Sequence, residues 1–123
     1  MRTFETGATR DQDTQKYDYE GFLCPLVLRE YARYMHQHRR QADGNLRASD
    51  NWQQGIPADA YMKSLWRHFH DLWMLHRGHQ PTDDQGNPVK LRDALCAILF
   101  NTSGYLHEDL KLPPVDQVGP QAG

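Results

Sequence analysis

The stretch YMKSLWRHFHDLWMLHRG, residues 61–78, decides the fold that this sequence predicts. Its apolar residues recur every three or four positions, so they fall on one face of a helix that turns about 100° per residue. We expect this helix to start after Ile56-Pro57 and to end at Gly78, a residue suited to closing a helix. The face that we expect to form the core comprises Tyr61, Met62, Leu65, Trp66, Phe69, Leu72, Trp73 and His76.

One further helix is predicted on each side of this stretch. The first begins near Pro25, because proline suits the first helical position, and runs to about Arg40. The other spans roughly Val89 to Lys111. Since no alternating strand pattern of useful length appears, the predicted fold is all-α, a small helical domain of about three main helices. The apolar face of the last helix comprises Leu91, Leu95, Ile98, Leu99, Tyr105 and Leu106.

The chain divides into a polar N-terminal arm at residues 1–20, a helical nucleotide-binding-like domain at residues 21–111 and a tail rich in Pro and Gly at residues 112–123. A loop from Gln41 to Ile56 is long for a small helical domain, and loops of that length are often functional. Cys24 and Cys96 show no metal-binding spacing and lie in apolar stretches. We therefore expect both to be buried free thiols.

Composition limits the classes of partner. The 123 residues allow one core, and a hydrophobic fraction of 38% predicts that this core is thin and that a homo-oligomer supports it. A formal net charge of −2 provides no overall field to attract DNA, RNA or an anionic membrane. No apolar run approaches the roughly 20 residues of a membrane span, and the N-terminus lacks a signal-peptide core. We expect a cytoplasmic protein.

Phosphate-binding residues are suggested by the middle helix. Ser64, His68 and Asp71 share one stripe, and Arg67 lies within reach of Asp71. An arginine fork beside an imidazole suits phosphate, and Lys63 is a further candidate. The alternative interpretation is an ordinary helix salt bridge with a histidine at the edge of the core.

The loop before this helix offers a candidate for base binding. Trp52 is flanked by Asp50 and Asn51, so the indole could stack on a base while its polar neighbours read the base edge. The alternative is a tryptophan that folds back to cover the helices. In the last helix, small and polar residues share a stripe that indicates close approach by another helix or by a ligand: Asp93, Ala97, Asn101, Gly104 and Glu108.

Metal binding has less support in the residues. The doublet His70-Asp71 is of the kind that HD-domain phosphohydrolases use, but seven histidines make a chance pair common. His36 and His38 lie on nearly opposite helix faces at this spacing, so the end of the first helix reads as solvated rather than as a metal site. No Glu-x-x-Glu pair occurs. Catalysis would need Asp71, Asp93 and Glu108 to meet across helices and bind Mg²⁺ or Mn²⁺.

Several short motifs, taken in order, resemble the N-terminal domain family of phage dATP/dGTP diphosphohydrolases over roughly residues 15 to 108. This chain departs from the family pattern at two places. Family members have a His pair just before the Ala-Leu-Cys segment, where this chain has Lys90 and Asp93. They also have an acidic residue after the glycine that ends the second helix, where this chain has His79. The motifs are Lys16-Tyr17-Asp18, Pro25-Leu26, Asp50-Asn51-Trp52 with Gly55, Arg67-His68 with Trp73, Gly78, Asp83 or Asp84 with Gly86, and Ala94-Leu95-Cys96 ending at Asn101.

The resemblance implies cleavage of a purine dNTP to dNMP and pyrophosphate in a phage-infected host cytoplasm. Under this hypothesis Arg67, His68 and Lys63 hold phosphates, and Trp52, Asn51 and Asn101 complete the nucleotide site. Mg²⁺ or Mn²⁺ bound by the three carboxylates would activate the attacking water. The alternative hypothesis keeps the pocket without the chemistry, as a phage protein that sequesters a nucleotide or a cyclic-nucleotide immune signal.

Overall fold

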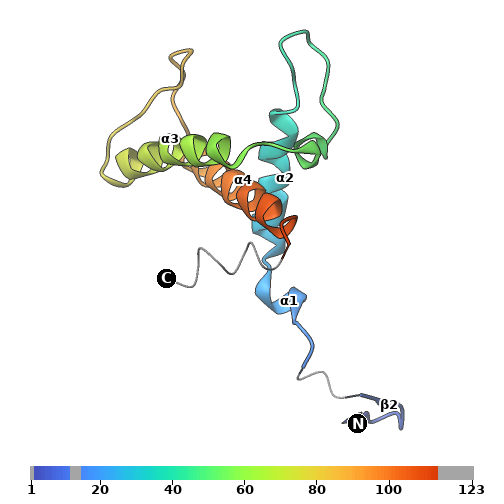
Figure 1. Cartoon of the computed structure of the whole chain (residues 1–123). Coiled ribbons are helices and arrows are strands. Elements are labelled where there is room, and N and C mark those ends of the chain that lie inside the picture. The colour runs from blue at the N-terminus through green and yellow to red at the C-terminus, as the bar shows by residue number, and fades with distance from the viewer. Residues whose placement is uncertain (1, 12–14, 114–123) are drawn as a thin grey trace, which may run out of the picture.

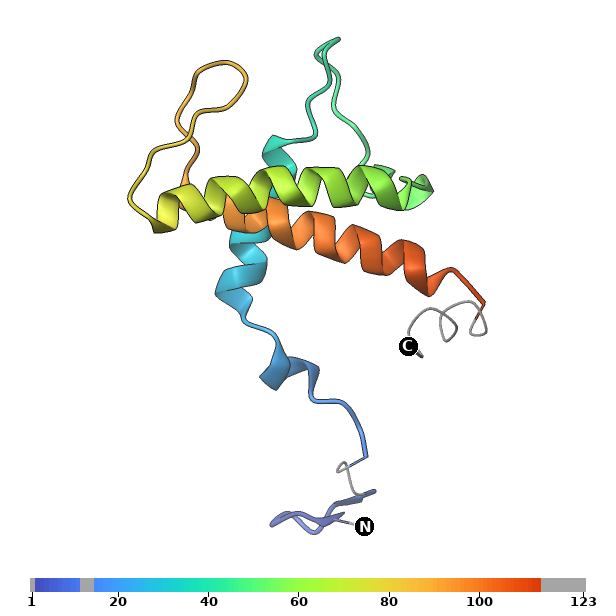
Figure 2. The same cartoon turned by 60° about the vertical axis from the view of Figure 1, so that its left-hand side comes forward.

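Three long helices make up most of the computed structural model, which describes residues 2–11 and 15–113. They are α2 (Pro25–Gln37), α3 (Ala58–His76) and α4 (Leu91–Leu110). α3 and α4 lie side by side along their length, and α2 crosses them (Figures 1 and 2). The predicted all-α class and the three helices are confirmed. α2 ends three residues earlier than predicted because the chain turns back into a hairpin.

The N-terminal arm contains structure that the sequence did not predict. Strands β1 (Arg2–Thr3) and β2 (Thr9–Arg10) pair antiparallel, and each is too short to show an alternating pattern. A short helix, α1 (Tyr19–Phe22), follows and is capped by Asp18, whose carboxylate accepts a hydrogen bond from the Gly21 amide at 2.9 Å. Figure 1 shows this arm extending away from α3 and α4. Most of the predicted tail lies outside the described residues.

The loop between α2 and α3 folds into a hairpin that positions charged side chains. Gly44 adopts a φ of +88°, and Arg40 pairs with Leu46 across the turn. The Arg47 amide donates to the Arg39 carbonyl at 2.7 Å, and Arg39 Nε donates to the Arg47 carbonyl at 2.8 Å. A 3₁₀ turn, η1 (Asn51–Gln54), then leads to α3. The hairpin therefore returns Arg47 to the end of α2.

The α3–α4 contact is close because α4 presents small residues to α3. Ala94, Ala97, Asn101 and Gly104 of α4 are buried, and Tyr61 of α3 is 2% exposed against Gly104. This confirms that the small and polar stripe of α4 is approached closely by another helix. The buried apolar residues are few, as the composition predicted: Tyr34, Tyr61, Ala94, Cys96 and Ala97.

The predicted core face of α3 is wrong for five of its eight members. Met62, Trp66, Phe69 and Trp73 are between 40% and 67% exposed, and His76 is exposed as well. Only the side that carries Tyr61 meets the small residues of α4, and the aromatic residues further round the helix are exposed. Cys24 is also exposed, against prediction, because it precedes the first turn of α2, whereas Cys96 is buried as expected.

Among the described residues, no helix has the length and apolar character to cross a bilayer.

Candidate functional site

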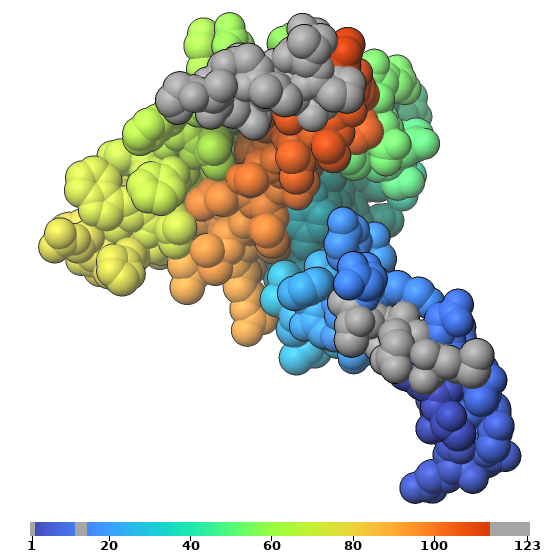
Figure 3. Space-filling model, turned by 60° about the horizontal axis from the view of Figure 1, so that its bottom comes forward, coloured from blue at the N-terminus to red at the C-terminus, as the bar shows by residue number. Residues whose placement is uncertain are grey.

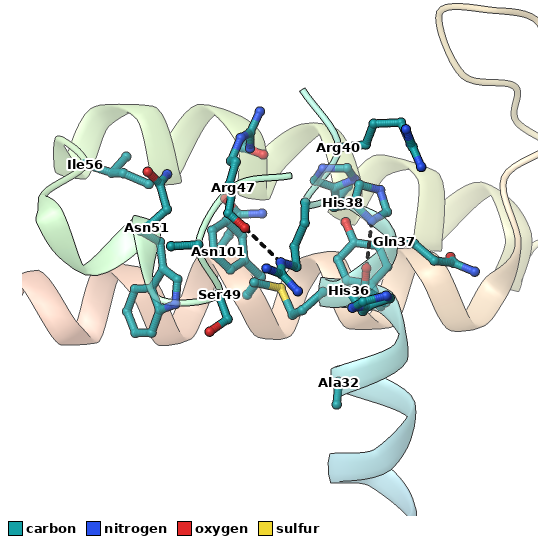
Figure 4. A pocket seen from close by; sticks show the side chains of 18 residues that line it. Ala32, His36, Gln37, His38, Arg40, Arg47, Ser49, Asn51, Ile56 and Asn101 are labelled. Atoms are coloured by element: carbon teal, nitrogen blue, oxygen red, sulfur yellow. Dashed lines mark hydrogen bonds between the residues drawn. The ribbon is translucent and has the colours of Figure 1, made fainter. Parts of the chain in front are cut away.

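A pocket of about 660 Å³ lies where the C-terminal end of α2, the hairpin, η1, α3 and α4 meet. This volume is in the range of small-molecule sites. Figure 4 shows His38 and Arg40 at one end of it, Asn51 and Ile56 at the other, and Arg47 between them. The lining includes Tyr34, His36, His38, Arg39, Arg40, Arg47, Asn51, Trp52, Ile56, Ser64, His68, Phe100 and Asn101.

Basic side chains dominate one end of the pocket. Arg39, Arg40 and Arg47 line it together with three histidines, and no aspartate or glutamate is among its described lining residues. Arg40 Nη1 donates to the Gly44 carbonyl at 3.3 Å, which ties this side chain to the hairpin. The Arg47 guanidinium makes no hydrogen bond within the part of the chain that the structure describes. The pocket is thus suited to an anion, with Arg47 available to bind it.

His38 is held in one orientation at the end of α2. Its Nδ1 lies 2.9 Å from the Tyr34 carbonyl, and a carbonyl only accepts, so Nδ1 carries a proton. Its ring packs against the Tyr34 ring at 4.1 Å between centroids. Burial raises the pKa of Tyr34 to about 12, so that phenol stays neutral at physiological pH. His38 therefore has Nε2 left for a ligand.

His68 approaches the pocket from α3. Burial lowers the pKa of His68, Asp71 raises it, and electrostatic interactions with Arg67 and His38 lower it further. The imidazole is therefore neutral near pH 7 when no ligand is bound. An anion in the pocket would favour its protonated form.

Aromatic and amide groups form the other end. The Trp52 ring packs against α4, with centroid distances of 4.8 Å to His107 and 6.4 Å to Phe100. Trp52 therefore folds back onto the helices and also lines the pocket. Asn101 is 3% exposed, and its Nδ2 donates to the Ala97 carbonyl at 2.7 Å. Its Oδ1 can accept a hydrogen bond from a ligand.

The predicted nucleotide-binding residues are only partly brought together. The pocket includes Asn51, Trp52, His68 and Asn101, whereas Lys63 and Arg67 are exposed on α3 and do not line it. Arg67 precedes His68 by one position, which turns it about 100° away around the helix.

The basic residues at the end of α2 were expected to be solvated, and their place in the pocket was missed. The signal that could have found them is the Asp43-Gly44-Asn45 turn, where the Asn45 amide donates to Asp43 Oδ1 at 3.0 Å. A tight turn at that point brings the segment after it back along the segment before it. Arg47 must then lie beside Arg39 and Arg40.

The three predicted metal ligands do not meet within one chain. Asp93 and Glu108 lie near opposite ends of α4, roughly 22 Å apart at a rise of 1.5 Å per residue. Asp93 Oδ1 accepts from Arg33 Nη2 at 2.8 Å, and Glu108 pairs with Lys111 at 2.8 Å. Asp71 lies on α3 and does not line the pocket. Within the described ranges, no group of three His, Cys, Asp or Glu side chains is arranged to hold a metal.

The pocket combines a basic end with an aromatic and amide end. That arrangement matches a ligand with an anionic group and a flat polar ring. No family model, no curated protein and no solved structure matches the chain.

Proposed function

We propose that the pocket binds a nucleotide, with its phosphates at the arginine end and its base near Trp52. The single observation that carries this proposal is the composition of the lining, which has three arginines and three histidines but no carboxylate among the described residues. A charge-assisted hydrogen bond contributes about 1.5–3 kcal/mol, so three of them at the upper end of that range reach the roughly 8 kcal/mol that corresponds to a micromolar Kd.

The phosphate end has one unfavourable element, the C-terminus of α2. The last carbonyls of a helix carry partial negative charge equivalent to about half an electron. His38 Nδ1 already donates a hydrogen bond to the Tyr34 carbonyl. Arg39, Arg40 and Arg47 add three full positive charges beside it. The net field at this end therefore favours an anion.

The base end supplies a flat apolar surface and amides. Trp52 and Phe100 offer ring surface, and Asn51 and Asn101 each carry a donor and an acceptor. An amide of this kind matches the donor and acceptor pair on the edge of adenine. The choice of a purine rests on the resemblance to the phage dATP/dGTP diphosphohydrolase domain.

We propose binding without hydrolysis, as in a protein that sequesters a nucleotide or a nucleotide signal. Metal-assisted attack on a triphosphate needs carboxylates beside the phosphates. Asp93 and Glu108 are paired with Arg33 and Lys111 instead, and neither they nor Asp71 lines the pocket. Hydrolysis as the resemblance implies would need carboxylates from another chain.

Incubation with separate samples of dATP, dGTP, dTTP and ATP, each with Mg²⁺ or Mn²⁺, tests the proposal. The free and the denaturation-released nucleotides are then separated by chromatography. Intact nucleotide that leaves solution and is recovered on denaturation is the expected result. Monophosphate and pyrophosphate would overturn the non-catalytic assignment, and unchanged free nucleotide for every probe would overturn nucleotide binding.

A further inference from the structure

One side of α4 is lined by leucines that face solvent. Their exposed fractions range from 41% to 66%. At 100° per residue they fall opposite the buried stripe of Ala94, Ala97, Asn101 and Gly104. α4 therefore buries its small residues and exposes these leucines. This leucine face consists of Leu91, Leu95, Leu99, Leu106 and Leu110.

The leucine face continues into a groove of about 720 Å³ between α4 and α2. Leu26 and Val27 of α2 and Leu95 and Leu99 of α4 line it, together with charged residues that include Arg29 and Arg92. Figure 3 shows α4 on the surface between α3 and the first part of α2. Apolar side chains together with arginines are common in protein interfaces.

Two pairs of leucines on the leucine face are placed symmetrically about the middle of α4, whereas the fifth leucine, Leu99, is matched by Thr102. Leu91 and Leu110 lie equally far from the midpoint of α4, which falls between Phe100 and Asn101, and so do Leu95 and Leu106. The same relation holds for Arg92 and Asp109, which have opposite charges. If two copies of α4 pack antiparallel about that midpoint, each leucine of these pairs faces a leucine and each Arg92 faces an Asp109.

We propose that two copies of this chain form a dimer through the leucine face of α4, with the two helices antiparallel about a two-fold axis at residues 100 and 101. A two-fold interface must be complementary to itself, and the mirrored order of leucines and charges meets that requirement. A different protein partner would impose no such mirror relation. The proposal is independent of the nucleotide pocket, since Asn101 lies on the opposite side of α4 from the leucines.

Sedimentation equilibrium of the wild-type chain and of charge-reversal variants tests this dimer. The wild type should be dimeric at micromolar concentration. Arg92→Asp alone and Asp109→Arg alone should each raise the dimer Kd about 10-fold, because each creates two like-charge contacts across the two-fold axis. The double variant should return the Kd to within about 3-fold of the wild type.

Matched reversals away from the leucine face serve as controls. Arg67→Asp and Asp59→Arg change exposed charges on α3, and they should leave the Kd within about 2-fold of the wild type. Circular dichroism checks that every variant keeps its helices. A wild-type chain that is still monomeric at a concentration 100-fold above the micromolar range would overturn the proposal. A dimer that ignores the single reversals, or that the double variant does not restore, would overturn the antiparallel arrangement.

Discussion

The ring of Tyr61 on α3 occupies the space that a side chain at Gly104 on α4 would need. A Cβ built at Gly104 would lie 2.6 Å from Tyr61 Oη and still closer to two ring carbons. Tyr61 is 2% exposed, so its ring has no open space to move into. The closeness of α3 and α4 at this point depends on the absence of that carbon.

Gly104→Ala should therefore lower the free energy of unfolding by about 1–3 kcal/mol through overpacking. In an open helix the same change would raise stability by about 1 kcal/mol, so the sign itself is informative. Urea denaturation followed by circular dichroism measures it. Ser103→Ala, on the exposed side of α4, is the control and should change little. A Gly104→Ala variant as stable as the wild type would mean that the two helices are not in this contact.

Anion binding should strengthen as the pH falls, in part through His68. Burial lowers the pKa of His68 in the free protein, and a bound phosphate would raise it, so binding takes up a proton. The contribution of His68 to phosphate affinity therefore increases as the pH falls below about 6.5. Calorimetry with dATP at pH 8 and pH 6 measures the change, and His68→Gln should show a smaller one. An equal pH dependence in both proteins would exclude His68 from the response.

Protein stability should respond to pH in the opposite direction through the same histidine. Because the pKa of His68 is lower in the folded protein than in the unfolded chain, the unfolded chain binds the proton more readily. This contribution is therefore present above pH 6.5 and is lost as the pH falls. The Tm of the ligand-free wild type should drop more between pH 7.5 and 5.5 than the Tm of His68→Gln. A larger drop in the variant would contradict the lowered pKa.

Asp93 should behave as a structural residue. It links α4 to α2 through Arg33, which also contacts Glu30 at 2.6 Å. Side chains in the Arg33–Asp93 pair are 39% and 32% exposed, so solvent screens the interaction. Asp93→Asn should cost less than about 1 kcal/mol in urea denaturation and leave dATP affinity unchanged. Loss of nucleotide binding in a variant of normal stability would instead give Asp93 a role at the ligand.

Helix positions followed from the sequence, whereas the side of each helix that is buried did not. The 3–4 spacing around Trp66 and the closing residue Gly78 placed α3 to within two residues. The same spacing could not tell which part of a wide apolar face meets α4, because that depends on the small residues of α4. Trp66 and Trp73 were therefore assigned to the core but lie 67% and 54% exposed.

The candidate site was predictable where residue type alone indicates a role. Trp52 and Asn51, in a long loop, and His68 and Asn101, on helix stripes, do line one pocket. The arginine end of the pocket was missed because it depends on the return of a hairpin across α2, which involves residues eight positions apart. The sequence analysis named Arg67, whose neighbours follow from helix spacing, and did not consider Arg47, whose neighbours depend on a turn.

The most direct test of nucleotide binding compares two single arginine variants by calorimetry with dATP and dGTP. Arg47 lines the pocket and Arg67 does not, so Arg47→Gln and Arg67→Gln remove the same charge from different places. We predict that Arg47→Gln weakens binding at least about 10-fold, as expected for the loss of one charge-assisted hydrogen bond, and that Arg67→Gln changes it less than about 2-fold. Equal affinities for Arg47→Gln and the wild type, or a larger loss in Arg67→Gln, would contradict this assignment of the pocket.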